Sequence, residues 1–207
     1  MKLPGEELVS LLIAVSFASG INVYATVATL GLLAHTHVMT LPPQLHAVSS
    51  WWVIAASGAL FAVEFVADKI PGVDLVWNVL HTFIRVPVSA LMAYQASAGL
   101  SPGEQAAATF AGGVIALIAH GGKTAARAAV TPSPEPFSNI ALSLSGDALA
   151  VSLTWLATVH PYVAGGIAAA LVLIIILLAR WAWRALKARF QAAKGAVRKV
   201  RMWGRVG

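Results

Sequence analysis

The sequence contains no cysteine. This absence excludes disulfide bonds, thiolate metal sites and cysteine nucleophiles. Charge is also scarce, because 11% of the 207 residues are charged, whereas a soluble domain usually has about 25%. The chain is instead 58% hydrophobic, and its mean hydropathy is +0.79. These proportions predict a protein that is surrounded by lipid rather than by water.

Familiar enzyme motifs are missing as well. The sequence has no HExxH motif, no P-loop and no GxGxxG motif. The tripeptide Ser145-Gly146-Asp147, together with a membrane histidine, is a weak match to an intramembrane serine hydrolase. An enzyme is therefore the third function considered, after a transporter and a structural protein, and we expect no cofactor.

The hydrophobic residues form six runs, each close to the ~20 residues that a helix needs to cross the hydrocarbon core. Proline, glycine and serine residues typical of turns separate most of the runs. The predicted fold class is all-α, a polytopic transmembrane helix bundle of about six spans with a basic amphipathic C-terminal helix. The predicted domains are a transmembrane helical domain, residues 1–180, and a basic amphipathic cytoplasmic tail, residues 181–207. The runs are residues 8–34, 50–67, 75–97, 105–128, 137–159 and 161–179.

Lysine and arginine are distributed unequally between the predicted loops. The segment from Arg180 onward contains nine of the 14 basic residues, whereas the loops 35–49 and 98–104 contain none. Basic residues accumulate on the cytoplasmic side of a membrane. We therefore expect a multi-pass protein with both termini in the cytoplasm.

Polar residues inside the runs recur at helical spacing. From Asp74 to Arg85 they follow steps of three or four residues, which places them on one face of a helix. Only the run 161–179 lacks such a stripe. A charge at the bilayer centre costs roughly 2.5–3.5 kcal/mol, so we expect the five polar stripes to face one another. The candidate substrate- or ion-binding residues are Asn22, Glu64, Asp68, Lys69, Asp74, His81, Arg85, His120, Lys123, Arg127, Asn139 and Asp147.

Arg85 and Asp147 lie deepest in the predicted membrane. Each lies about ten residues into a helix that enters from the cytoplasm, or roughly 15 Å at 1.5 Å per residue. Equal depth and opposite charge predict a buried ion pair, with Asn22, His81 and His120 within reach. Two interpretations of this pair stay open: part of a transport site, or a lock that only holds helices together.

Several candidates also have a purely structural explanation. Basic side chains near helix ends can extend toward water, and Asp74 follows Pro-Gly, as a helix N-cap often does. Asn22 can bind a neighbouring helix. His81 and His120 are equally well explained as core histidines and as proton carriers.

Four histidines lie in the predicted outer loops. Three or four imidazoles are able to hold zinc or copper, but their spacing matches no metal motif and no carboxylate lies among them. We therefore expect no metal site and interpret these side chains as solvated. They are His35, His37, His46 and His160.

The segment that begins at Arg180 continues the last helix and has no acidic residue. Its basic side chains form one stripe, and apolar residues such as Leu186 and Phe190 lie along a flank of it. This pattern is typical of a helix on the inner leaflet, where each basic residue contributes ~1 kcal/mol beside anionic lipid. We expect the tail to bind anionic lipids. We expect no nucleic acid as a partner, because no recognition motif is present.

Four blocks of the sequence are distinctive: ASGINVYATVATLGLL at 18–33, EFVADKIPGVDLVWNVLHTFIRVP at 64–87, AHGGKTAARA at 119–128 and SPEPFSNIALSLSGD at 133–147. Through these blocks the chain resembles the bacterial domain-of-unknown-function 4126 family of small integral membrane proteins. The resemblance covers nearly all of the chain before the tail. It implies an integral protein of the bacterial inner membrane, and it assigns no substrate, cofactor or site residue.

The leading hypothesis is a small transporter or channel for an ion or small polar solute, with a buried charged cavity as its path. The alternative is a structural or lipid-binding membrane protein whose buried charge pairs only lock helices. A transporter needs a water-filled route to the polar stripes, whereas a lock leaves them sealed and mutually paired. The expected partners are the lipid bilayer and the transported ion or solute, and a homo-oligomer stays open.

Overall fold

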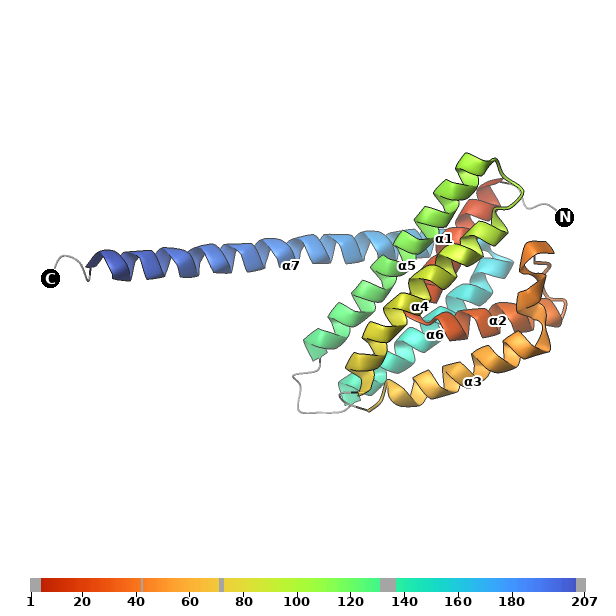
Figure 1. Cartoon of the computed structure of the whole chain (residues 1–207), viewed down its shortest axis with the longest axis horizontal. Helices are drawn as coiled ribbons and strands as arrows, with labels where there is room; N and C mark the ends of the chain where they lie inside the picture. Colours follow the sequence, from red (N-terminus) through yellow and green to blue (C-terminus); the bar gives the residue numbers. More distant parts are fainter. Residues whose placement is uncertain (1–4, 42, 71–72, 131–136, 204–207) are drawn as a thin grey trace. The chain divides into compact units, whose positions relative to one another are not determined.

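The structure, a computed structural model, describes residues 5–41, 43–70, 73–130 and 137–203, without the side chains of 73–75, 78, 192, 193 and 195–203. All regular secondary structure in these ranges is helical, which confirms the all-α prediction. The chain divides into two compact units, residues 1–172 and 173–207. The predicted domain boundary after residue 180 stays a prediction. The elements are α1 (Gly5–Ile21), α2 (Val23–His35), the 3-10 helix η1 (Pro43–Ser49), α3 (Trp51–Ala67), α4 (Val73–Ala96), α5 (Pro102–Val130), α6 (Phe137–Val159) and α7 (Pro161–Trp203) (Figure 1).

Three helical segments in the described residues are long and apolar enough to cross a membrane: α5, α6 and residues 161–191 of α7. A fourth span results if η1 and α3, which meet at an angle of 60°, are taken as one. The described part of the chain therefore has three or four helices with the length and composition of membrane spans. The predicted count of about six is not confirmed; the two parts of the first apolar run, α1 and α2, are 17 and 13 residues long, and α2 is a shorter apolar helix.

The first apolar run breaks at Asn22. The backbone of Asn22 is extended, with φ −151° and ψ 102°, and this residue lies between the end of α1 and the start of α2. The Asn22 side-chain oxygen accepts a hydrogen bond from the Ala25 amide at 3.0 Å. Asparagine is among the best N-cap residues because its short side chain reaches the free amides of the first turn. The two helices consequently run in different directions (Figure 1).

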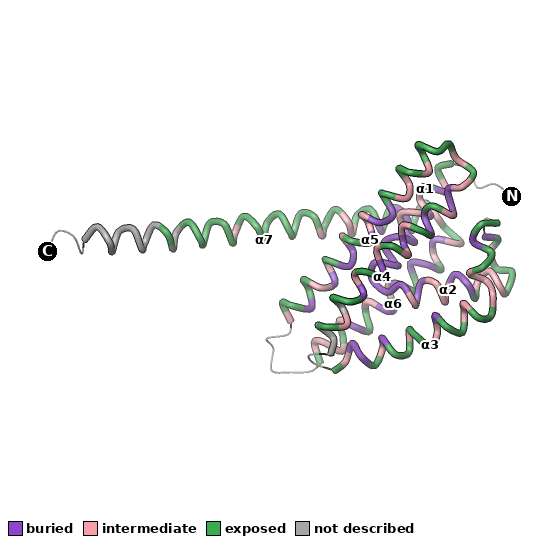
Figure 2. The backbone as a smooth tube through the Cα atoms, in the orientation of Figure 1, coloured by how far each residue is buried: buried purple, intermediate pink, exposed green. Residues whose placement is uncertain are grey.

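Small residues allow the helices of the first unit to pack closely. α1 contacts α4, α5 and α6, and α4 also packs along α5. A Cβ atom at Gly20 of α1 would lie 2.4 Å from the carbonyl oxygen of Ala116 in α5. Only glycine permits this approach, as in the close crossings of membrane helices. The buried residues of these helices lie on the sides that face one another (Figure 2).

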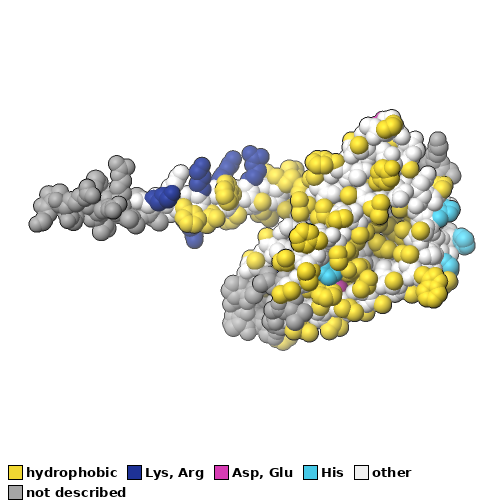
Figure 3. Space-filling view, viewed as in Figure 1, with side chains coloured by type: hydrophobic (Ala, Val, Ile, Leu, Met, Phe, Trp, Pro, Cys, Tyr) yellow, Lys and Arg dark blue, Asp and Glu magenta, His cyan; other side chains and the backbone are white. Residues whose placement is uncertain are grey.

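The distribution of residue types in the first unit is inverted relative to a soluble protein. Arg85 and Glu64 are 0% exposed, whereas Phe83 and Phe110 are 77% and 75% exposed. Hydrophobic side chains cover much of the visible surface of the helices of the first unit (Figure 3). Because apolar surface is stable against lipid and ionisable groups turn toward the bundle interior, this arrangement fits a membrane-embedded protein.

Candidate functional site

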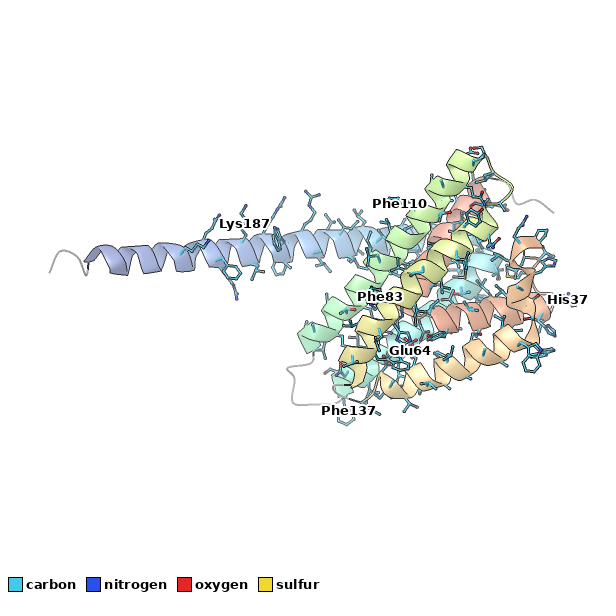
Figure 4. All side chains as sticks on the ribbon, viewed as in Figure 1. His37, Glu64, Phe83, Phe110, Phe137 and Lys187 are labelled. Carbon is cyan, nitrogen blue, oxygen red and sulfur yellow. The ribbon has the colours of Figure 1, made fainter. Side chains whose placement is uncertain are left out.

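Five buried ionisable side chains meet in the interior of the first unit. Glu64 and Asp68 lie one turn apart at the end of α3 and are 0% and 2% exposed. Arg85 projects from α4, and Lys123 and Arg127 project from α5, all of them buried. We call these five residues the charge network. Glu64 lies among the helices of the first unit, as its label shows (Figure 4).

Arg85 connects the network to a histidine. Its Nη2 atom donates to Glu64 Oε1, and its Nη1 atom lies 2.8 Å from His120 Nδ1. Because a guanidinium only donates hydrogen bonds, His120 Nδ1 must accept. The imidazole is therefore neutral in this arrangement, and its Nε2–H donates to Thr82 Oγ1 at 2.8 Å.

Lys123 lies at the centre of the network and also contacts the helix break. Its Nζ atom is 3.2 Å from Asp68 Oδ2 and 3.7 Å from Glu64 Oε1. The same ammonium donates to the carbonyl oxygen of Ile21, the last residue of α1, at 3.1 Å. The ammonium thus donates hydrogen bonds to Asp68 and to Ile21, and it lies within ion-pair distance of Glu64. Lys123 thereby joins both carboxylates to the break.

Arg127 and Asp68 form a two-point contact. Arg127 Nη1 lies 3.0 Å from Asp68 Oδ1, and Nη2 lies 3.0 Å from Asp68 Oδ2. The planar guanidinium matches the two oxygens of a carboxylate, which makes this geometry strong and specific. Asp68 is consequently bound by two cations, Arg127 and Lys123.

Asp147 of α6 is bound by an amide. Asn22 Nδ2 donates to Asp147 Oδ1 at 2.9 Å, and Asp147 is 6% exposed. The Asn22 side chain thus uses its oxygen to cap α2 and its nitrogen to hold Asp147. Within the described part of the chain, Asp147 forms no ion pair.

The predicted Arg85–Asp147 ion pair is therefore wrong, because Arg85 pairs with Glu64 and Asp147 with Asn22. In the predicted spans Arg85 and Asp147 lie deepest, so Glu64 lies at a shallower level than Arg85. The long side chain of arginine spans about one helical turn, so it reaches a carboxylate that a count of residues places at another depth. The break then brings Asn22 beside Asp147.

The other predicted site residues lie outside the network. His81 Nε2 contacts the Tyr24 hydroxyl at 3.1 Å, and its Nδ1 lies 2.7 Å from the Trp77 carbonyl oxygen. The Lys69 ammonium donates to the Phe65 carbonyl at 2.7 Å and lies over the Phe65 ring. Lys69 therefore caps the C-terminal end of α3 by binding a carbonyl oxygen of its last turn.

Two further predicted residues lie at the starts of helices. Asn139 lies in the first turn of α6. The side chain of Asp74, in the first turn of α4, lies outside the described residues.

Sequence reasoning missed the helix break and two polar partners. Tyr24 and Thr82 contact the predicted histidines, and the carbonyl of Ile21 receives Lys123. Thr82 is three residues before Arg85 and so shares its helix face, a signal that the sequence does carry. A signal for the break is the polar Asn22 two residues after Gly20 in an apolar run.

The outer histidines do not converge. His35 Nδ1 lies 3.0 Å from the Ser49 carbonyl, and its ring contacts Trp51. His37 adopts a positive φ of 59° at the end of the turn after α2. In the described ranges, no group of three or more His, Cys, Asp or Glu residues is placed to hold a metal ion.

No curated protein and no solved structure matches this chain. A family model described as "Domain of unknown function (DUF4126)" matches residues 9–181. The match includes the helix break, the whole charge network and Asp147. It covers well over half of the 207 residues. The chain therefore belongs to the DUF4126 family.

Proposed function

We propose that this protein is a small transporter or channel that moves an ion or small polar solute across the bacterial inner membrane. The observation that carries the proposal is the position of the charge network beside the helix break. In many secondary transporters, interrupted membrane helices direct their free ends toward the substrate or the coupling ion. Lys123 at the end of α1 and Asp147 at the start of α2 fit this pattern.

The two helix ends match the charges that they meet. The C-terminal end of a helix carries partial negative charge and the N-terminal end partial positive charge. Lys123 binds the last carbonyl of α1, and Asp147 binds the N-cap of α2. Non-helical backbone within a membrane is stable only where protein buries it or where it lines a cavity. The break is thus a natural place for a charged solute to exchange with these side chains.

The network offers competing partners for a solute of either sign. Lys123 has carboxylate oxygens of both Glu64 and Asp68 within 3.7 Å, so its position shifts if either carboxylate is neutralised. An anion would compete for Arg85, Lys123 and Arg127, whereas a cation or proton would compete for the carboxylates. The formal charge of the network plus Asp147 is zero, so exchange of one ion leaves a charge imbalance that favours a second exchange.

The same proposal includes six spans with both termini in the cytoplasm. In this topology, α1 and α2 form one interrupted span, η1 and α3 form the second, and α4 to α7 supply the others. The segregation of Lys and Arg supports the orientation. The residues of α7 from Arg180 onward would then lie at the inner surface and bind anionic lipids.

A structural lock is the second candidate, and the burial of the network favours it. All five side chains are 0–6% exposed and ion-paired. A sealed, paired network is what a lock requires. It is also the closed state that alternating access requires, so function has to decide between the two.

Flux measurements in proteoliposomes test the proposal. Purified protein is reconstituted, and a panel of small anions, cations and polar solutes is offered with and without a pH gradient. We expect at least one to move, and Lys123→Gln to abolish its movement. Lys69→Gln is the matched control, because Lys69 lies outside the network. Absence of flux for the whole panel, or equal flux through folded Lys123→Gln protein, would contradict a transport function.

A further inference from the structure

Three side-chain oxygens on α6 are buried and lack a hydrogen-bond partner among the described residues: Asn139 Oδ1, Ser143 Oγ and Asp147 Oδ2. The residues are four apart, so they share one face of the helix. Ser143 is 0% exposed and Asp147 is 6% exposed. Most buried side-chain polar atoms bind either protein or ordered water, so three such oxygens in one row indicate a line of positions for water or protons.

The row leads from the start of α6 to the helix break. Asn139 lies in the first turn after Phe137, which is labelled in Figure 4, and Asp147 contacts Asn22 at the break. Residues four apart on a helix are separated by about 6 Å along its axis. One water molecule between neighbouring side chains bridges such a spacing with two hydrogen bonds. The row therefore has the geometry of a single-file path for protons.

The chemistry of the row suits a proton better than a metal cation. It contains one carboxyl group, one hydroxyl group and one amide oxygen, whereas divalent cations need about six oxygen ligands, usually including several carboxylates. A hydroxyl group both donates and accepts hydrogen bonds, so Ser143 can pass a proton in either direction. Asp147 is the group in the row that can store one.

We propose that Asp147 is the proton-binding group of the transport site and that the row of Ser143 and Asn139 connects it to water at the start of α6. On release, the Oδ2–H bond breaks, the proton passes through the Ser143 hydroxyl group and the bridging waters, and a carboxylate remains at Asp147; Asn139 Oδ1 accepts a hydrogen bond that orients the last water. On binding, the reverse transfer restores the neutral acid. Asn22 donates to Oδ1, and this oxygen is able to accept whether or not Oδ2 carries a proton, so the bond holds the carboxyl group in place. The role of this proton in driving a solute rests on the proposed function.

The surroundings of Asp147 explain how a proton could affect the network. α6 packs against α1, α2 and α5. On these helices, Lys123 is the charged residue near Asp147. A Cβ atom at Gly146, the residue before Asp147, would lie 3.8 Å from Lys123 Cε. A negative charge at Asp147 therefore draws Lys123 away from Glu64 and Asp68. The remaining titratable groups of the three helices are Glu6, Glu7, Tyr24, His35, Glu104, His120 and Arg127.

The other titratable groups of the three helices lie at helix ends or bind other residues, so they do not link Asp147 to the charge network. Glu6 and Glu7 lie in the first turn of α1, and Glu104 lies in the first turn of α5. His35 lies in the last turn of α2. Tyr24 and His120 contact His81 and Arg85, and Arg127 binds Asp68. Proton binding at Asp147 is thus transmitted mainly through Lys123.

Infrared difference spectroscopy of the full-length protein in lipid tests the proposal. A buried protonated carboxyl group gives a C=O stretching band separate from those of carboxylates. We expect a band that is present at low pH, disappears as the pH rises, and is missing in Asp147→Asn. Asn22→Ala, which removes the hydrogen bond to Oδ1, should shift the frequency of the band. Glu104→Gln is the control and should leave the band unchanged.

The row is tested by the rate of proton exchange after a pH jump. Ser143→Ala should slow the loss of the Asp147 band at least several-fold without moving its pH midpoint. Ser145→Ala is the matched control, because Ser145 is exposed on the same helix and donates to the Leu142 carbonyl. Equal rates in the two variants would overturn the path.

The experiments distinguish failure of the proton-binding role of Asp147 from failure of the proposed transport function. If no titrating band is lost in Asp147→Asn, the proton-binding role is overturned, even where solute flux is measured. If the band titrates as expected but no solute moves, the transport function fails while Asp147 stands as a proton-binding residue. Flux that is insensitive to a pH gradient, together with a titrating band, would contradict the coupling between them.

Discussion

Asn22 and Asp147, 125 residues apart in sequence, are joined by a hydrogen bond of 2.9 Å. The same Asn22 side chain accepts a hydrogen bond from the Ala25 amide and so begins α2. One amide group therefore determines both where the first apolar run breaks and what holds the buried carboxyl group of α6. Local chain direction and the environment of the site depend on a single residue.

Asn22→Ala should destabilise the protein more than loss of an ordinary helix cap. The substitution removes a cap, which is worth about 0.5–2 kcal/mol, and leaves a buried acceptor unsatisfied, which costs about 1–3 kcal/mol. We expect the free energy of unfolding in detergent to fall by about 2–4 kcal/mol in total. Ser50→Ala is the control, because Ser50 caps α3 through the Val53 amide. An effect of Asn22→Ala no larger than that of Ser50→Ala would show that the bond to Asp147 contributes nothing.

The Glu64–Arg85 pair should show strong coupling in a double-mutant cycle. Removing one partner of a buried ion pair leaves an uncompensated charge and costs roughly 3–5 kcal/mol. We expect Glu64→Gln and Arg85→Gln each to lower the free energy of unfolding by that order. The double variant should lose less than the sum of the two, and Lys69→Gln should change stability by less than ~0.5 kcal/mol.

The same double variant distinguishes a transport site from a lock. A folded Glu64→Gln/Arg85→Gln protein that still moves solute would assign the pair a structural role. A folded double variant without flux would assign it to transport. Additive losses of stability in the cycle would contradict direct coupling between the two side chains.

Gly20 should be intolerant of even the smallest side chain. A Cβ atom at this position would lie 2.4 Å from the Ala116 carbonyl oxygen and 2.7 Å from the Ala116 Cα atom, so Gly20→Ala forces α1 and α5 apart. Overpacking of this kind costs about 1–3 kcal/mol. Gly58→Ala is the matched control, since nothing lies within 4 Å of its Cβ position. That control should be neutral or stabilise α3 by up to ~1 kcal/mol, as measured by thermal unfolding.

Much of the candidate site could be anticipated from helical periodicity. Steps of three and four residues place Arg85 of α4, and Lys123 and Arg127 of α5, on faces that the structure turns inward. A period identifies the buried face of a helix because side chains repeat every 3.6 residues. It does not identify the neighbouring helix, and for that reason the partner assigned to Arg85 was wrong.

The interruption of the first helix could not be obtained in the same way. Residues 8–34 are apolar enough to read as one span, and the local signals at Gly20 and Asn22 do not by themselves show that the helix stops there. The break is stabilised by Lys123 at the carbonyl of Ile21 and by Asp147 at Asn22. Both partners lie more than 100 residues away in sequence, so tertiary contacts add to the local Asn22 cap in stabilising the break.

The proposed topology predicts which loops are accessible from outside. The chain has no cysteine, so single cysteines can be introduced without background. Cysteines at Gln44 and Ser101 should react with an impermeant thiol reagent applied to intact cells. One at Ser133, which lies outside the described residues, should react only after the membrane is permeabilised. Labelling of Ser133→Cys from outside would contradict the orientation.

The basic segment of α7 should bind anionic membranes electrostatically. A peptide of residues 180–205 carries nine basic and no acidic residues. We expect it to bind vesicles that contain anionic lipid and to dissociate as salt rises, because the Debye length falls to ~3 Å at 1 M. Vesicles of neutral lipid are the control. Binding that is independent of salt and of lipid charge would indicate a hydrophobic mode instead.

The tail beyond Arg184 should be dispensable for the membrane-embedded helices. Residues 1–172 form one compact unit by themselves. A chain that ends after Arg184 should therefore keep the thermal unfolding midpoint of the full-length protein in detergent. A large decrease in that midpoint would show that the tail supports the bundle.

The helix break has a consequence for biosynthesis. The Ile21 carbonyl and the Asn22 amide find their partners 102 and 125 residues further along the chain. In the proposed topology, the segments that carry Lys123 and Asp147 have not yet left the ribosome when α1 and α2 enter the bilayer. The exposed polar groups at the break must remain near water or an insertion factor until α5 and α6 arrive. The N-terminal helices of this protein are thus expected to reach their final depth last, although they are made first.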